Sequence, residues 1–238
     1  MTRSMDSVGD DSSIELLAGL ASTRTIRRYT SDPVPPEDLN SILWHATRAP
    51  SGSNRQPVRY LALVDGPRAA RAKSLLGESF RRGWSAKLRQ DGYESGSGLD
   101  PDSPKARQAR AMQEYVDNIE SVPVVVLVCL VRYRDPNPYE GASVYPACQN
   151  LLLAARALGY GGALTMWHQG VESELRTLLD VPDDVALSAC ITLGKPRGSH
   201  GPVRRKPLHD VVFDDRWGVE AAWAHDPEGT RHAGGAPR

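Results

Sequence analysis

The chain has 238 residues, 40% hydrophobic and 24% charged, which is enough to bury one sizeable core but short for two domains. Lys plus Arg and Asp plus Glu both number 29, so no net charge draws the protein to nucleic acid or anionic lipid. The three cysteines lack a CxxC spacing and predict buried, reduced thiols in a cytoplasmic protein. The longest apolar run, residues 124–131, is far below the roughly 20 residues that span a bilayer, so neither export nor membrane insertion is expected.

Two helices are expected near the amino terminus, after a disordered tail over residues 1–11. Ser12, followed three residues later by Glu15, forms a capping box that opens the apolar stretch IELLAGLA. Pro35 and Pro36 open a second helix. Its apolar residues recur at helical spacing and predict one face packed on the core: Leu39, Ile42, Leu43 and Ala46.

Three short apolar runs, residues 59–64, 123–131 and 186–193, predict strands, because each is bounded by Pro, Gly or Asp. The middle run is apolar throughout, as expected for the centre of a sheet that helices cover on both faces. Residues 142–160 predict a long buried helix that is apolar nearly all round. Residues 91–104 have the composition of a mobile connection, between helical segments ending near Ala86 and resuming near Lys105, within a flap over about residues 80–118.

The segment after the first helix, residues 23–29, concentrates basic and hydroxyl side chains. An arginine guanidinium is a planar fork of donors that matches phosphate oxygens, and threonine hydroxyls can complete such a cradle. The segment is equally compatible with a solvated basic surface. Its candidate phosphate ligands are Arg24, Thr25, Arg27 and Arg28.

The loop over residues 49–57 is the second candidate. Gly52 permits a positive φ angle, and the polar side chains around it could hydrogen-bond a polar heterocycle. The loop would serve as a plain connection equally well. Its candidate binding residues are Pro50, Ser51, Gly52, Ser53, Asn54 and Gln56.

Two further segments follow the buried helix. Small residues over 159–163 would let the backbone of Leu164, Thr165 and Met166 approach a flat ligand closely, although Gly159 is equally explained as a helix C-cap. The spacing is not GxGxxG, so no Rossmann site is predicted. The basic loop over 194–207 could close over a phosphate or lie exposed, with Arg204 and Arg205 as its candidates. The histidines show no metal-ligand spacing, and His168, beside the third segment, is expected to be structural.

Taken in this order, the four segments resemble the nitroreductase family of FMN-dependent oxidoreductases over roughly residues 14–217. TRTIRRYTSDPVPPEDLNSILWHATRAPSGSNRQP is similar to the family's opening, in which a basic segment, PVP, an amphipathic helix and an AP(S/T)xxN loop follow one another. ALGYGGALTMW resembles the segment beneath the flavin, and PVRRKPLHDVV with residues 215–217 resembles the closing phosphate-contacting loop. Many members have Arg at the position of Thr23 and Ser at that of Thr25.

The resemblance implies an α+β three-layer sandwich, with a central and mostly antiparallel sheet flanked by helices, over residues 12–218. Residues 219–238 are then a flexible tail. It further implies an intertwined homodimer with two FMN sites at its interface. In such a dimer the phosphate is held by Arg24, Thr25, Arg27 and Arg205, with Arg28 and Arg204 nearby. Ser51, Ser53 and Asn54 reach the flavin of the partner subunit, and the backbone of residues 164–166 faces flavin N5.

The implied activity is ping-pong hydride transfer from NAD(P)H through flavin N5 to a nitroaromatic, a quinone or a similar small acceptor. No catalytic side chain and no metal is assigned, since the flavin carries the chemistry. Three alternatives remain: a flavin-dependent oxidase or dehydrogenase of a metabolite, an FMN store or sensor without turnover, and a structural dimer without cofactor. The residues alone do not distinguish FMN from the deazaflavin F420.

Overall fold

The computed structural model describes residues 14–233, so the predicted tail over residues 1–11 and the predicted cap Ser12 lie outside the described residues. The chain divides into two compact units, the first ending at His200 and the second beginning at Gly201. Within the described residues no helix is both long and apolar enough to cross a bilayer.

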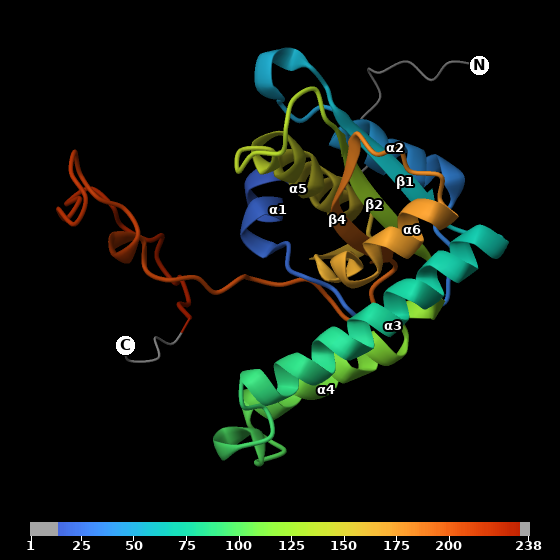
Figure 1. Cartoon of the computed structure of the whole chain (residues 1–238). Helices are drawn as coiled ribbons and strands as arrows, with labels where there is room; N and C mark the ends of the chain where they lie inside the picture. Colours follow the sequence, from blue (N-terminus) through green and yellow to red (C-terminus); the bar gives the residue numbers. More distant parts are fainter. Residues whose placement is uncertain (1–13, 234–238) are drawn as a thin grey trace. The chain divides into compact units, whose positions relative to one another are not determined.

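A four-stranded sheet forms the centre of the first unit (Figure 1). Its strands are β1 (Val58–Leu63), β2 (Val124–Val131), β3 (Gly161–Thr165) and β4 (Val185–Gly194). Their order is β1-β2-β4-β3, and every neighbouring pair is antiparallel. The predicted strands 59–64, 123–131 and 186–193 are confirmed to within one residue at each end, and the expected antiparallel sheet is confirmed.

The third strand, β3, is not among the predicted strands. It begins with Gly161 and Gly162, which have low strand propensity. The strand forms because β4 offers a long pairing edge, with Gly161 opposite Gly194 and Thr165 opposite Cys190. Since β3 pairs only with β4 in the described sheet, it is an edge strand.

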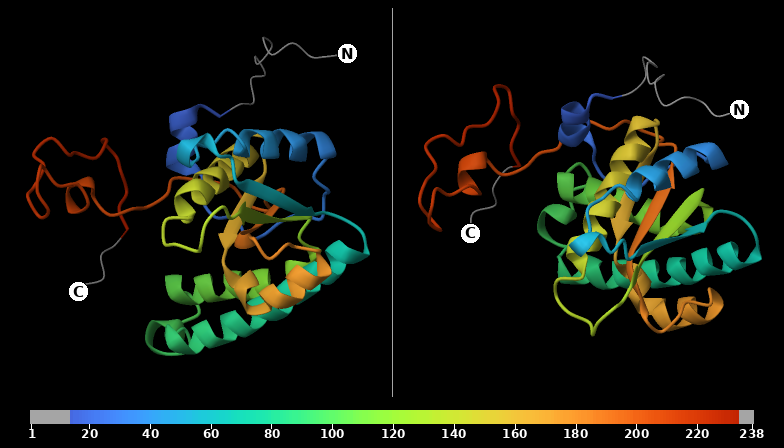
Figure 2. Two further views of the ribbon diagram at one scale, coloured as in Figure 1. Left: turned by 45° about the horizontal axis from the view of Figure 1, so that its top comes forward. Right: turned by 90° about the horizontal axis from the view of Figure 1, so that it is seen from above.

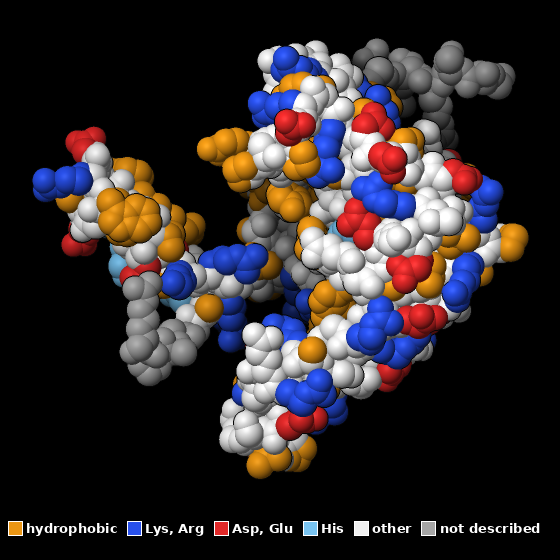
Figure 3. Space-filling view, viewed as in Figure 1, with side chains coloured by type: hydrophobic (Ala, Val, Ile, Leu, Met, Phe, Trp, Pro, Cys, Tyr) orange, Lys and Arg blue, Asp and Glu red, His pale blue; other side chains and the backbone are white. Residues whose placement is uncertain are grey.

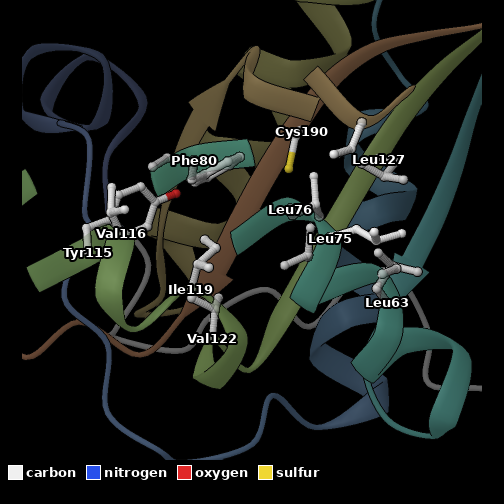
Figure 4. Close-up of a cluster of buried hydrophobic side chains, with 14 of the residues drawn as sticks. Leu63, Leu75, Leu76, Phe80, Tyr115, Val116, Ile119, Val122, Leu127 and Cys190 are labelled. Atoms are coloured by element: carbon white, nitrogen blue, oxygen red, sulfur yellow. The ribbon is translucent and has the colours of Figure 1, made fainter. Parts of the chain in front are cut away.

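Helices cover both faces of the sheet and form the predicted three layers (Figure 2). Alternate residues of β2 explain why this strand is apolar throughout: Val124, Val126 and Val128 join the core under α2 (Pro36–Ala46) and α5 (Gly141–Ala157). Val125, Leu127 and Cys129 join the core on the other face, under α3 (Pro67–Gln90), α4 (Pro104–Asp117) and α6 (Glu172–Leu178). Figure 4 shows this second core, with Leu127 near Cys190 and Leu76, and with Phe80 of α3 and Ile119 after α4 on the far side of the cluster.

Several helix ends differ from the prediction. The first helix, α1 (Leu16–Ser22), is capped by Glu15, whose carboxylate accepts the Ala18 N–H at 3.0 Å. The second, α2, begins at Pro36 with Glu37 and Asp38 in its first turn, as predicted. The third continues to Gln90, beyond the expected end near Ala86, and the connection to α4 is correspondingly shorter.

The C-cap explanation of Gly159 is confirmed. The helix α5 ends at Ala157, and Gly159 adopts a φ of 83°. The Tyr160 N–H donates to the Ala155 carbonyl at 2.8 Å and the Gly159 N–H to the Arg156 carbonyl at 3.1 Å, which is the pairing of a Schellman motif. This turn leads the chain directly from α5 into β3.

The second unit has little regular structure. It contains a short 3₁₀ turn, Leu208–Asp210, and isolated bridges that join Phe213 to Glu220 and Arg205 to His232. The Phe213 and Trp217 rings pack at 5.0 Å between centroids. Residues 234–238, at the end of the predicted tail, lie outside the described residues.

Candidate functional site

Three of the four segments singled out in the sequence lie side by side. The Ile26 N–H donates to the Gly162 carbonyl at 2.9 Å, which joins the basic segment to the outer edge of β3. The Thr30 N–H donates to the Lys195 carbonyl at 2.9 Å, and the Arg197 N–H donates to the Arg28 carbonyl at 3.0 Å. The start of the 194–207 loop therefore packs against the same segment.

The glycines at the start of β3 make this approach possible. A Cβ on Gly161 would lie 2.5 Å from Ile26 Cγ1, and one on Gly162 would lie 2.7 Å from Leu152 Cδ2. A Cβ on Gly162 would also lie 2.8 Å from the backbone oxygen of Thr192, which cannot move aside within the sheet, so glycine is required at both positions. The small residues at the start of β3 thus accommodate the protein's own Ile26, and the predicted approach of residues 164–166 to a flat ligand stays a prediction. Farther along β3, Leu164 is 37% exposed, and an edge strand leaves outward-facing N–H and C=O groups for a ligand.

A buried chain of three hydroxyl groups holds the basic segment against the core. The Tyr29 hydroxyl donates to the Ile26 carbonyl at 2.5 Å and lies 2.9 Å from Thr192 Oγ1, which in turn lies 2.8 Å from the Tyr115 hydroxyl. Because Tyr29 has a single hydroxyl proton, the chain has one consistent direction, from Tyr115 through Thr192 to Tyr29. Burial raises the pKa of both tyrosines well above the ordinary value, so both remain proton donors.

Arg24 lies in a neighbourhood that suits an anion. The Arg24 guanidinium donates to the Ser199 carbonyl at 2.7 Å, and the Arg24 backbone N–H donates to His200 Nδ1 at 3.4 Å. His200 Nε2 donates to the Tyr160 carbonyl at 3.1 Å. Burial lowers the pKa of His200, and the positive charges of Arg156 and Arg24 lower it further.

Two polar atoms in this neighbourhood are buried without a hydrogen-bond partner within the described residues, namely Thr23 Oγ1 and Arg156 Nε. A buried donor left unpaired costs about 1–3 kcal/mol, so such atoms indicate a missing partner. A phosphate beside Arg24 would supply acceptor oxygens of the right charge, and the residues present therefore fit a phosphate-bearing cofactor. Sequence reasoning missed Arg156 and His200. For Arg156 a signal was available, because it is a charged residue in the last turn of the otherwise apolar helix α5.

Arg27 and Arg28 line a hollow of about 90 Å³ between the basic segment and the end of α4. Arg28 Nε lies 2.7 Å from the Glu114 carboxylate, so this arginine already has an anionic partner from α4. Arg27 lowers the pKa values of Tyr29 and Tyr115 by its charge, against the larger effect of burial. The two neighbouring arginines therefore have different surroundings.

The loop over residues 49–57 has an unusual backbone. Gly52 does not take the positive φ that the sequence suggests; Ser53, Asn54 and Gln56 take φ values of 52°, 52° and 51° instead. Local hydrogen bonds stabilise this shape, from the Gln56 N–H to Ser51 Oγ at 2.9 Å and from Gln56 Nε2 to Asn54 Oδ1 at 3.2 Å. Three side-chain-bearing residues in a left-handed conformation are costly and are typical of ligand-binding loops.

This loop is joined to α5 and not to the basic segment. The Gly52 N–H donates to Ser143 Oγ at 3.3 Å. A hollow of about 130 Å³ beneath it is lined by residues of the loop, β1 and α5. The hydroxyl of Tyr60, on β1, is buried there without a hydrogen-bond partner in the described residues. Burial raises the pKa of Tyr60 to about 12.

Arg204 and Arg205 belong to the second unit. There the Arg205 guanidinium donates to the Arg204 carbonyl at 2.9 Å, and the Arg205 carbonyl accepts the Ala233 N–H at 2.8 Å. Both side chains are exposed within that unit.

His168 has the surroundings of a structural residue. It is completely buried, with Nε2 at 2.9 Å from the Leu187 carbonyl and Nδ1 without a partner in the described structure. Burial lowers its pKa below the ordinary value of 6.5. Among residues 14–233, no group of three or more metal-ligating side chains is arranged to hold a metal ion.

The burial of His168 predicts that the folded protein is less stable in acid. Because burial lowers the pKa of His168 in the folded state, the unfolded chain takes up the proton first as the pH falls below about 6.5. The free energy of unfolding should therefore fall with pH below that value, by up to about 1.4 kcal/mol per pH unit for this residue. Urea unfolding between pH 7.5 and 5 measures the slope. His168→Gln should make it shallower, and an unchanged slope would contradict the assignment.

Comparison with known proteins gives a consistent result. The model of the family described as the nitroreductase family matches residues 20–195, well over half of the chain. An NADH dehydrogenase of Thermus thermophilus is 28% identical over 197 residues, covering 80% of this chain and 91% of that protein. An iodotyrosine deiodinase of Nematostella vectensis is 24% identical over 209 residues, covering 84% and 75%. The structure of a nitroreductase from Desulfovibrio desulfuricans in complex with FMN superposes with a TM-score of 0.63 at 25% identity, covering 86% of this chain and 98% of that one.

Proposed function

Because the chain belongs to the nitroreductase family, we propose that it is an FMN-dependent oxidoreductase that uses NAD(P)H to reduce a small electron acceptor such as a nitroaromatic or a quinone. The observation that carries the proposal is the pair of buried, unpartnered donors, Thr23 Oγ1 and Arg156 Nε, in the neighbourhood of Arg24. The similarity to an FMN-bound nitroreductase and to an NADH dehydrogenase supports the same cofactor and the same class of donor.

In this proposal the side chains of Arg24, Thr25 and Arg27 hold the cofactor phosphate, and Arg204 and Arg205 are further candidate phosphate ligands. Arg28 takes a supporting part, since Glu114 already engages it. The outward backbone groups of Leu164, Thr165 and Met166 orient the ring system. When bound, FMN supplies a hydride-accepting N5. The chain's contribution is to hold both reactants against that atom and to place positive charge near the ring.

We further propose a homodimer, in which the loop over residues 49–57 reaches the partner's cofactor through Pro50, Ser51, Gly52, Ser53, Asn54 and Gln56. The support is an apolar surface on α1, where Leu16 and Leu17 are 67% and 70% exposed. The helix α5, to which the loop is tied, adds Tyr145 at 47% exposure. Two copies that bury this surface around a twofold axis would each offer the loop to the other. The three cysteines are unpaired and buried, which supports the proposed cytoplasmic location.

An anaerobic absorbance experiment tests the function. The purified protein should show the flavin bands, and NADPH or NADH should bleach them within seconds, since a stacked nicotinamide passes its hydride to N5. Addition of a nitroaromatic or a quinone to the reduced protein should then restore the flavin bands. Flavin that binds but resists both donors would favour a storage protein or an oxidase of another metabolite. Protein that stays colourless after incubation with FMN would refute the proposal.

A further inference from the structure

Two arginines that have no part in the site described above, one in the 49–57 loop and one after β2, share one aromatic ring. The Arg55 guanidinium carbon lies 4.5 Å from the centre of the Tyr133 ring, and that of Arg134 lies 5.2 Å from the same centre. Tyr133 itself is 56% exposed. A guanidinium that stacks on an aromatic face can still donate from its edge, and Arg134 Nη2 does so to Asn137 Oδ1 at 3.4 Å.

Neither guanidinium has a carboxylate within 4.0 Å among the described residues. Of the two acids in the 132–140 loop, Glu140 is engaged by Arg132, at 2.9 and 3.1 Å, and Asp135 is not paired with either arginine. The Arg132–Glu140 pair anchors the loop that carries Tyr133. Two positive charges near one ring repel each other, and a nearby anion would offset the repulsion.

This cluster belongs to the surface of the 49–57 loop. The Val131 N–H donates to the Pro57 carbonyl at 2.9 Å, and Gly52 is bonded to Ser143 at the start of α5. The two loops therefore form one surface, where Lys and Arg side chains gather at the upper end of the view in Figure 3. Arg55 stands next to Asn54, for which a contact with the partner's cofactor is proposed above.

We propose that Arg55 and Arg134, positioned by Tyr133, bind the phosphate groups of the NAD(P)H donor at the mouth of the flavin site. The inference rests on the proposed function, which places the dihydronicotinamide over the flavin beside this loop. The ligand class follows from the chemistry, because two guanidiniums that share one ring, neither of them paired with a carboxylate among the described residues, match phosphate oxygens in charge and geometry.

The test separates phosphate binding from hydride transfer. Rapid-mixing reduction of the bound flavin is followed with NADPH, with NADH and with N-benzyl-1,4-dihydronicotinamide, a donor without phosphates. Arg55→Gln and Arg134→Gln should each raise the apparent Kd for NADPH roughly tenfold, the double variant more, with little change in the limiting rate. The phosphate-free donor should react equally with all variants. Arg48→Gln is the matched control, since Arg48 is also stacked on an exposed ring, Trp44, at 4.8 Å.

Calorimetric titration of NADP⁺ into the oxidised protein gives a second readout that needs no turnover, and the same weakening is expected there. Equal losses with all three donors would show that the arginines serve the flavin site itself and would overturn the proposal. Unchanged binding of NADPH to the variants would also overturn the proposal. The same holds if the variants bind only a carboxylated acceptor, such as nitrobenzoate, more weakly than the wild type does. Failure of the wild type to accept hydride from any donor would count against the proposed function, while the titration would still decide whether these arginines bind phosphate.

Discussion

Replacing Arg24 with Ala should lower the affinity of the apoprotein for FMN about 10- to 100-fold and leave its affinity for riboflavin nearly unchanged. Arg24 is exposed and its side chain bonds only a carbonyl, so the substitution removes a cation without opening the core. A charge-assisted hydrogen bond is worth about 1.5–3 kcal/mol, which corresponds to that range of affinity. Riboflavin lacks the phosphate and should not sense the change. Quenching of flavin fluorescence measures both affinities.

The control for this experiment is Arg68→Ala. Arg68 is an equally exposed arginine that pairs with Asp180 at 3.0 Å on a different part of the first unit. Its loss should leave both affinities unchanged. Thr25→Val should weaken FMN more than riboflavin, though less than Arg24→Ala, because it removes a neutral donor. A parallel loss of FMN and riboflavin affinity in the Arg24 variant would place this arginine at the ring system and not at the phosphate.

The parts of the fold that the sequence predicted are those in which local pattern and tertiary environment agree. The β2 run is apolar at every position because both of its faces are covered, and such a run is hard to mistake. The start of α2 was predictable because proline at the first helical position and acids in the first turn act locally. The strand β3 was not, since its two glycines are dictated by the Ile26 side chain and the Thr192 backbone oxygen, which are distant in sequence.

The candidate site shows the same division. The segments were recognisable, but their internal geometry was not: the positive φ angles fall on Ser53, Asn54 and Gln56, while Gly52 does without one. Asn tolerates the left-handed region because its short polar side chain can bond locally. The sequence also could not predict that Arg28 is the paired arginine, because its partner Glu114 lies on α4, far along the chain.

The residues that hold the basic segment in place could not be found from local pattern, because Thr192 lies 163 positions after Tyr29. They nevertheless decide the shape of the site. The hydroxyl chain ends on the Ile26 carbonyl, and the Ile26 N–H is bonded to β3, so this one residue ties the basic segment to both the core and the sheet edge.

Replacing Thr192 with Val should therefore lower the free energy of unfolding by about 1–3 kcal/mol, although the side chain keeps its shape and its place in a strand. Thr192 is completely buried, and its hydroxyl serves both tyrosines. Without it the Tyr115 hydroxyl has no acceptor and the Tyr29 oxygen loses its donor. Burial holds the pKa of both phenols well above the ordinary value, so both stay protonated at neutral pH and still need their hydrogen-bond partners. Urea unfolding at pH 7.5 measures the loss.

Two variants separate this hydrogen-bond effect from simple packing. Thr192→Ser keeps the hydroxyl and removes a methyl group, so it should recover the tyrosine contacts and retain FMN affinity. Thr177→Val removes a hydroxyl from the exposed face of α6, where it bonds only the Ser173 carbonyl, and should change stability by less than about 0.5 kcal/mol. If Thr192→Val were as stable as the wild type while Thr192→Ser were not, the methyl group would be what matters. The position of Ile26 would then depend on packing and on its bond to β3, not on the hydroxyl chain beneath it.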